Sequence, residues 1–334
     1  MTARTRLKPL VRRARFYGAL TRAVGGAALQ RVRGGKTHPD WPLAYELVVP
    51  FLRVTAGEFY DFGVVLARKR VSPITPSIAR KVELSQRRIA GLDADVHTPR
   101  RAHDGSPLKT VLFLHGGGYV TCSPRSHRDV IARIAESAHA RCIAPDYRLA
   151  PAHPFPAALQ DALACYRALL AEGVSPDSLF VAGDSAGGGL TVSLAHALYA
   201  SGEPLPRGLV LLSPWLDLTL TREALSGQGH GDYLGAHSIA TNALQYADRD
   251  LLSTPAVSPL QGDLHGLPPI LMETGEWEVL REQNERFAQK ARAAGVEVQH
   301  TVVAGMLHAF PCFSAILPQG VAALARVGAF IRAH

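Results

Sequence analysis

The chain is poor in cysteine and has no long apolar run. Only 4 cysteines occur in 334 residues, and their spacing shows neither a zinc-binding pattern nor a redox pair. A disulfide framework is not expected at this density in so long a chain, which favours a reducing, cytoplasmic setting. No stretch of about 18 apolar residues occurs. We therefore expect neither a metal site nor a membrane-spanning helix.

Acidic residues are absent from the first 36 positions, which carry ten basic side chains. The whole chain has a net charge of +8 (36 basic, 28 acidic), so the remaining residues sum to −2 (26 basic, 28 acidic). A nucleic-acid-binding protein usually spreads basic residues over its folded surface. Because the charge is instead confined to one end of the chain, we expect no nucleic-acid partner.

This basic arm, residues 1–36, has the spacing of an amphipathic helix. Its apolar residues recur every three to four positions with arginines between them: Leu7, Leu10, Ala14, Tyr17, Leu20 and Val24. Two interpretations stay open. The helix packs over the protein's own core, which we favour, or it rests on an anionic membrane surface. A signal peptide is not expected, because Arg22 interrupts the candidate apolar stretch.

From Thr110 onward, short apolar runs alternate with longer helical patterns. The expected strands cover residues 111–114, 141–144, 179–182, 209–212, 270–273 and 296–303, and the expected helices cover 128–138, 157–170, 187–200, 281–294 and 321–331. Strands that alternate with crossover helices predict a mostly parallel sheet covered by helices on both faces. Residues 1–72 and 216–253 lack this rhythm. We expect them to form a helical cap on a core of residues 73–215 and 254–334.

The segment Gly183-Asp184-Ser185-Ala186-Gly187 lies between an expected strand and an expected helix. A nucleophilic serine needs its oxygen exposed on a sharp strand-to-helix turn, where flanking glycines avoid a clash. The N-terminus of the following helix favours developing negative charge. The alternative is a tight turn with an ordinary N-cap serine, but the position between strand and helix favours a nucleophile.

A second glycine-rich segment, His115-Gly116-Gly117-Gly118-Tyr119, directly follows the expected strand 111–114. Consecutive glycines let the backbone approach a ligand closely and direct several N–H groups at one point, as a tetrahedral oxyanion requires. The spacing does not match a phosphate-binding loop. Its position upstream of the serine motif is the order that the α/β-hydrolase fold needs.

Together these motifs resemble the hormone-sensitive-lipase-like family of α/β-hydrolases, in particular its bacterial esterases. Further segments resemble that family: Ser123–His127, Asp146–Pro151, His153–Ala158, Gly183–Gly188 and Ser213-Pro214-Trp215. The resemblance covers about residues 105–334, whereas residues 1–70 match only in general character. It implies an α/β-hydrolase fold with a helical cap.

The resemblance also implies the partners of Ser185. The family places its catalytic base in a Gly-Met-x-His loop after the last long strand, which selects His308; the carboxyl ends of such strands are where ligands bind. The family's acid falls in the turn after the preceding strand, which lands on Glu278, where many relatives have Asp. Glu276 stays open as the alternative acid.

The remaining roles also come from the resemblance. The oxyanion donors would be the backbone N–H groups of Gly117, Gly118 and Ala186. Tyr119 and Trp215 would contact substrate, with ordinary core packing as the alternative for Trp215. Four further residues are expected to be structural: His115 behind the glycine loop, Asp184 bracing the serine turn, and Asp146 with Arg148 as a buried ion pair.

These observations predict a serine carboxylesterase that hydrolyses small, apolar, short-to-medium acyl esters through an acyl-enzyme, with no metal or organic cofactor. A lipid, thioester or amide hydrolase with the same triad is the alternative. A non-catalytic hormone receptor of the same fold is disfavoured because His308, which such receptors lack, is present. Peripheral membrane contact through the arm and a homodimer both stay open.

Overall fold

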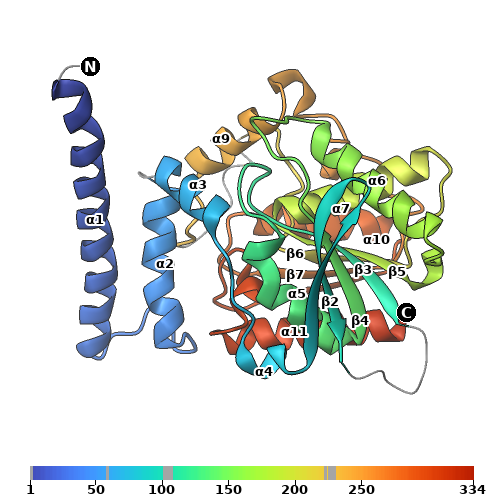
Figure 1. The fold of residues 1–334 in the computed structure, drawn as a ribbon, viewed down its shortest axis with the longest axis horizontal. Helices are drawn as coiled ribbons and strands as arrows, with labels where there is room; N and C mark the ends of the chain where they lie inside the picture. The colour runs from blue at the N-terminus through green and yellow to red at the C-terminus, as the bar shows by residue number, and fades with distance from the viewer. Residues whose placement is uncertain (1–2, 58–59, 101–107, 222–223, 225–230) are drawn as a thin grey trace.

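The computed structural model describes residues 3–57, 60–100, 108–221, 224 and 231–334, with the side chains of 3–13 and 62 left out. Eight strands form one sheet in the order β1-β2-β4-β3-β5-β6-β7-β8 (Figure 1). Their bounds are β1 Val82–Ile89, β2 Leu92–Pro99, β3 Lys109–Leu114, β4 Ala140–Pro145, β5 Leu179–Asp184, β6 Gly208–Leu212, β7 Ile270–Gly275 and β8 Val298–Val303. Strands β3 to β8 pair in parallel, whereas β2 pairs antiparallel with both β1 and β4.

The mostly parallel sheet and the α/β-hydrolase fold expected from the sequence are confirmed. The six expected strands correspond to β3 to β8. The antiparallel pair β1 and β2 was not expected, and it extends the sheet beyond β4.

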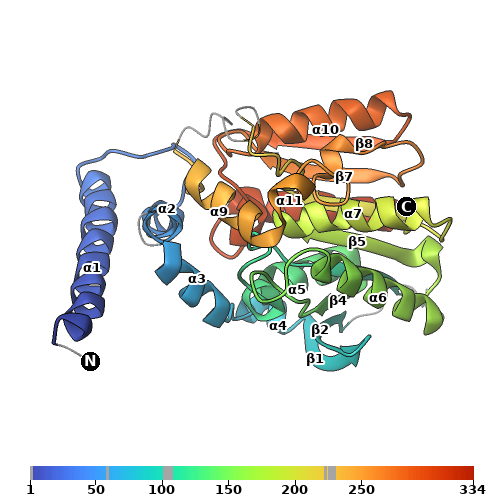
Figure 2. The ribbon, with the colours of Figure 1, turned by 90° about the horizontal axis from the view of Figure 1, so that it is seen from above.

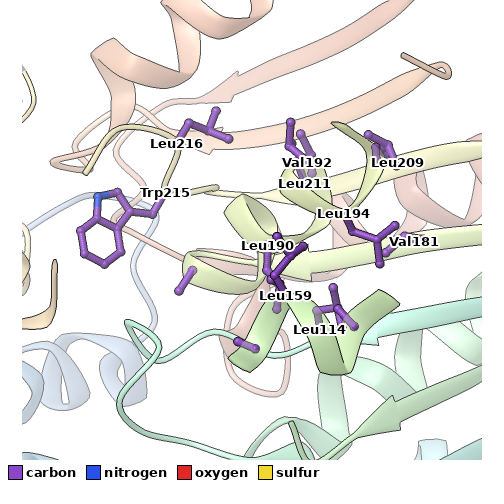
Figure 3. Packing of buried hydrophobic residues seen from close by; sticks show 14 of the residues in the cluster. Leu114, Leu159, Val181, Leu190, Val192, Leu194, Leu209, Leu211, Trp215 and Leu216 are labelled. Atoms are coloured by element: carbon purple, nitrogen blue, oxygen red, sulfur yellow. The ribbon is translucent and has the colours of Figure 1, made fainter. Parts of the chain in front are cut away.

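Helices cover both faces of the sheet, as Figure 2 shows from above. One face carries α6 (Ala157–Ala171), α7 (Ala186–Ala200) and α10 (Arg281–Ala293); the other carries α5 (Arg128–Ala138) and α11 (Pro318–Ala333). On the first face, Leu190 and Leu194 of α7 pack with Val181 of β5 and Leu209 of β6, all fully buried (Figure 3). Continuous apolar strands of this kind are stable because both faces are removed from water.

The N-terminal helices are α1 (Ala3–Val32), α2 (Leu43–Ala56), α3 (Tyr60–Lys69) and the short α4 (Pro76–Ala79). Helix α1 lies outermost, and α2 separates it from the rest of the molecule (Figure 1). Phe16 is buried, and Arg31 forms an ion pair of 3.2 Å with the buried Glu46 of α2. The expected apolar stripe is confirmed only in part: Leu20 and Val24 are half-buried, whereas Ala14 is exposed and Tyr17 is 63% exposed. The side chains of Leu7 and Leu10 lie outside the described residues.

Helix α9 (Ala236–Tyr246) follows β6 in the sequence and lies near α3 at one end of the sheet (Figure 2). Short 3-10 turns complete the described fold: η1 Pro124–His127, η2 Pro176–Ser178, η3 Arg249–Leu251, η4 Pro259–Gln261 and η5 Phe310–Phe313. Within the residues described, no helix combines the length and apolar character needed to cross a bilayer.

Candidate active site

Ser185 occupies a sharp turn between β5 and α7. Its backbone angles, φ +51° and ψ −121°, lie outside the usual regions for a non-glycine residue. The chain approaches β3 so closely after this turn that a Cβ on Gly187 would collide with the carbonyl oxygen of Leu114. The strained turn holds the serine hydroxyl at the carboxyl edge of the sheet, as a nucleophile requires.

His308 lies in the loop after β8 and faces this serine. Its Nε2 is 2.8 Å from Ser185 Oγ, although the two residues are 123 positions apart. Burial lowers the pKa of His308 to about 4, which keeps the imidazole neutral near pH 7 and able to accept a proton. Its Nδ1 is buried and has no hydrogen-bond partner among the described residues.

Glu278, in the turn after β7, is 1% exposed. Its carboxylate accepts hydrogen bonds from Ser213 Oγ at 2.5 Å, Gly275 N at 2.8 Å and Asn284 Nδ2 at 2.9 Å. Burial raises its pKa to about 8, because desolvation penalises the charged form. Among the described contacts, none bonds Glu278 directly to His308. The two are linked through Ser213, which also accepts the Ala309 N–H at 3.0 Å.

Glu276, the alternative acid, differs from Glu278 in its burial and in its hydrogen-bond partner. It is only partly buried, and its carboxylate accepts the backbone N–H of Gly305 at 2.8 Å. This contact braces the beginning of the histidine loop, three residues before His308. Glu278 is the candidate that shares a hydrogen-bonded partner with the residue after His308.

The glycine loop after β3 lies beside the serine turn. Asp184 accepts the Gly116 N–H at 2.9 Å, so the residue before the nucleophile fixes the start of this loop. Gly117 has a φ of +117°, which favours glycine. The N–H groups of Gly117, Gly118 and Ala186 donate to no protein group in the described part of the chain. All three remain available to an oxyanion.

His115 packs behind the loop, its ring stacked on Tyr147 with centroids 4.3 Å apart. The expected buried pair of Asp146 and Arg148 is wrong. Arg148 instead binds Asp161 at 2.7 Å, and Asp146 is exposed. The motif fixes a loop as expected, but through a carboxylate on α6.

A cavity of about 230 Å³ opens over Ser185 and His308. Its wall is formed by the glycine loop, by α2 and α3, and by the segment around α9, with residues that include Leu52, Thr55, Tyr60, Val64, Trp215, Tyr233 and Asn242. Trp215 therefore reaches the cavity. Tyr119 does not line it: the residue is 1% exposed, and its ring stacks on that of Tyr246 with centroids 3.7 Å apart. This corrects the expected substrate contact of Tyr119 to a packing role.

Asp232 and Tyr233 were not identified from the sequence. The Asp232 carboxylate accepts the N–H of Val279 at 2.8 Å and that of His308 at 3.4 Å. Burial raises the pKa of Asp232 to about 6. The hydroxyl of Tyr233 donates to the His308 carbonyl at 3.0 Å. The segment before α9 thus binds both the loop after β7 and the loop that carries His308, and no local sequence pattern marks either residue.

His127, Asp184 and Cys312 place three potential metal-ligand atoms within 4.8 Å of one another. The sequence predicts no metal site, and the wide spacing of these residues gives no signal for one. Two of the three already bind each other, because His127 Nε2 lies 3.3 Å from the Asp184 carboxylate. Since that carboxylate also holds Gly116, the cluster braces the serine turn.

The fold and this geometry define an α/β-hydrolase. The alpha/beta hydrolase fold family matches residues 111–312, and the chain belongs to this family. Within it, the chain lies in the hormone-sensitive-lipase-like branch of bacterial esterases and is a carboxylic-ester hydrolase.

Individual relatives agree with this placement. An acetyl-hydrolase of Streptomyces hygroscopicus is 40% identical over 230 residues, which cover 67% of this chain and 75% of the relative. The solved esterase EstE5 is 33% identical with a TM-score of 0.78, covering 85% and 96% of the two chains. A solved esterase of the bacterial hormone-sensitive lipase family is 33% identical with a TM-score of 0.73, covering 94% and 97%.

Proposed function

We propose that Ser185 is the nucleophile of a carboxylesterase that works through an acyl-enzyme. The observation that carries this proposal is the 2.8 Å contact between Ser185 Oγ and His308 Nε2 beneath the cavity. The serine oxygen attacks the ester carbonyl while His308 takes its proton, and His308 then protonates the leaving alcohol. Water hydrolyses the acyl-enzyme by the same route.

The developing negative charge of each tetrahedral intermediate falls on the former carbonyl oxygen. The N–H groups of Gly117, Gly118 and Ala186 are the proposed donors to that oxygen. Their freedom from other partners in the described residues supports this role. Such preorganised donors stabilise the transition state by about 3–4 kcal/mol each in comparable hydrolases.

Glu278 is the proposed acid that holds His308 and stabilises its cationic form. Glu278→Gln is expected to reduce kcat by about 10³- to 10⁴-fold, because the amide cannot stabilise an imidazolium. Glu276→Gln is the matched control, two residues away in the same turn, and should lose less than about tenfold. Steady-state kinetics on a soluble acetyl ester measures both. A crippling effect of Glu276→Gln with a nearly silent Glu278→Gln would assign the acid to Glu276.

We propose small, apolar, short-to-medium acyl esters as substrates. The modest cavity, with apolar side chains such as Leu52 and Val64 in its wall, supports this choice. Two relatives are named acetyl-hydrolase and ethyl acetate hydrolase, and these names also support small acyl groups. A panel of acyl esters of increasing length, with matched thioesters and amides, tests the proposal. Highest kcat/KM on a long-chain lipid, a thioester or an amide would reject it.

Residues 1–72 and 216–253 are proposed to form the cap over the core of residues 73–215 and 254–334. The contributions of α2, α3 and the α9 segment to the cavity wall support this division. Helix α1 supplies no described wall residue, and it packs on α2 from outside. We also propose a cytoplasmic location, which the four free thiols favour.

Deletion of residues 1–36 tests whether the arm belongs to the cap. The deletion removes ten positive charges and exposes the face of α2 that contacts α1. We expect the truncated protein to aggregate or to change its acyl-length preference, measured by light scattering and by the ester panel. Vesicle flotation with anionic lipid at low and high salt is the counter-test, since salt screens exposed charges. Salt-sensitive binding by the full chain alone, with unchanged ester kinetics after truncation, would favour a membrane-surface arm instead.

A further inference from the structure

Ser213 is a fully buried residue directly after β6 that has no part in the mechanism described above. Its φ of +48° lies in the left-handed region, which is strained for a residue with a side chain. The next residue, Pro214, adds to this strain because a proline favours an extended conformation in the residue before it. Such strain persists only where the surroundings enforce it, and it often occurs at functional sites.

The hydrogen bonds of Ser213 follow from its neighbours when Glu278 is ionised, because a carboxylate can only accept. The N–H of Ala309 can only donate, so Ser213 Oγ accepts it, at 3.0 Å. The single hydroxyl proton is then left for the Glu278 carboxylate, 2.5 Å away. A separate bond from Ser213 N to the Glu273 carbonyl, at 2.7 Å, anchors the residue to β7. The hydroxyl therefore joins the acid turn to the histidine loop.

No cation assists Glu278 among its described hydrogen-bond partners. Its carboxylate is held by one hydroxyl, one backbone N–H and one amide, from Ser213, Gly275 and Asn284. Among these three, Ser213 is the partner whose side chain also accepts a hydrogen bond from the histidine loop, from Ala309 N. The carboxylate of a buried acid without a cation depends on such donors for its ionisation and its orientation.

We propose that Ser213 is a positioning residue for ester hydrolysis, whose hydroxyl orients the Glu278 carboxylate and ties it to the loop that carries His308. This inference rests on the proposed function, in which Glu278 acts on His308. It also assigns a role to the Ser213-Pro214-Trp215 segment. The strained turn of this segment places the Ser213 hydroxyl between the turn after β7 and the loop after β8.

The proposed role of Ser213 predicts a change in the pH dependence of kcat/KM. A hydrogen bond to an ionised carboxylate favours that form, so removing the Ser213 hydroxyl raises the pKa of Glu278 further. The other titratable groups around Glu278 are Asp232 before α9, which also raises its pKa, Tyr45 of α2 and His308. Because Glu278 must be ionised to stabilise the imidazolium, the acid limb of the kcat/KM profile should move to higher pH.

Two substitutions separate the hydroxyl from the backbone. Ser213→Ala removes the hydroxyl and keeps the strained Cβ, whereas Ser213→Gly removes the hydroxyl and relieves the strain. We expect both to lower kcat by about ten- to a hundredfold, as loss of an orienting partner does, with little change in KM and the same upward shift of the acid limb. If Ser213 serves only the turn, Ser213→Gly should match wild type, and that result would overturn the proposal.

Ser258 provides a matched control for the loss of a buried hydroxyl. It is fully buried, accepts the Leu218 N–H at 2.7 Å and donates to the Leu252 carbonyl at 2.6 Å, outside the cavity wall. Ser258→Ala should lower Tm to a similar extent but leave kcat and the pH profile unchanged. An equal change in kcat and in the pH profile for Ser258→Ala would reduce the Ser213 effect to general destabilisation and overturn the proposal.

A double variant and a label separate this inference from the proposed function. If Ser213 acts through Glu278, adding Ser213→Ala to Glu278→Gln should lower kcat by less than about threefold more, because coupled residues are not additive. Fully multiplicative effects would overturn the inference. Phosphonate labelling of the wild type and of Ser213→Gly should occur at Ser185 in both, more slowly in the variant. Labelling elsewhere in the wild type would instead refute the proposed function.

Discussion

Replacing Ser185 by alanine is expected to reduce ester hydrolysis by about five to six orders of magnitude. The variant has no oxygen to form the acyl-enzyme, and the remaining oxyanion donors can only assist direct attack by water. The fold should persist, since the change removes one atom from a side chain at the cavity floor. Steady-state kinetics with a chromogenic acetyl ester measures the loss, and circular dichroism checks the fold.

Ser193→Ala is the control for this variant. Ser193 lies on the same helix α7, is 2% exposed, and its hydroxyl has no hydrogen-bond partner among the described residues. Its removal should leave kcat within about twofold of wild type. A phosphonate inhibitor should label the control protein stoichiometrically and leave the Ser185→Ala variant unlabelled. Labelling of another serine would show that the nucleophile has been misassigned.

His308→Ala should be as severe as Ser185→Ala, because the serine is a weak nucleophile without its base. The double variant should be no worse than either single one, since the two residues act as a unit. Kinetic measurements of these variants at pH 7 and at pH 10 test this prediction. The loss in His308→Ala should be smaller at pH 10, because hydroxide partly replaces the missing base.

His300→Gln is the matched control on the same chain segment. His300 lies on β8, and its Nε2 lies 2.9 Å from Thr274 Oγ1, away from the cavity wall. This variant should retain wild-type kcat, with at most a lower Tm. If His308→Ala keeps activity within tenfold of wild type, the base must be sought in another residue.

Local patterns in the sequence are sufficient to predict the serine turn, the glycine loop and six strands. Buried parallel strands read as continuous apolar runs, so β3 to β8 are visible in the sequence. The pair β1 and β2 is not, because β1 is half exposed and carries four consecutive polar residues, Ser85 to Arg88, before the short turn at Ala90 and Gly91. Without a continuous apolar run or a strong turn dipeptide, the pair gives a weak signal.

Contacts between distant segments could not be predicted from the sequence in this way. The acidic residue nearest to Arg148 in the sequence is Asp146, but the packing of α6 selects Asp161 instead. Ser213 meets Glu278 and Ala309 across 65 and 96 positions. Tyr119 follows the glycine loop, where substrate contact is expected, but its left-handed φ of +62° accompanies a ring stacked on Tyr246. In each case the three-dimensional neighbour decides the role.

The hydrogen bonds of Asp232 to Val279 and His308 limit which segments of this enzyme can be exchanged. Exchanging the segment 216–253 for that of a relative is an obvious way to alter acyl preference. In this chain, however, the same segment supplies the acceptor for the N–H groups of Val279 and His308. A chimera without a carboxylate at position 232 would leave two amides beside the triad unsatisfied, at a cost of about 1–3 kcal/mol each if they stay dry. A replacement segment that changes acyl preference therefore also affects the loops that carry Glu278 and His308. It must keep a carboxylate at position 232 to hold them in place.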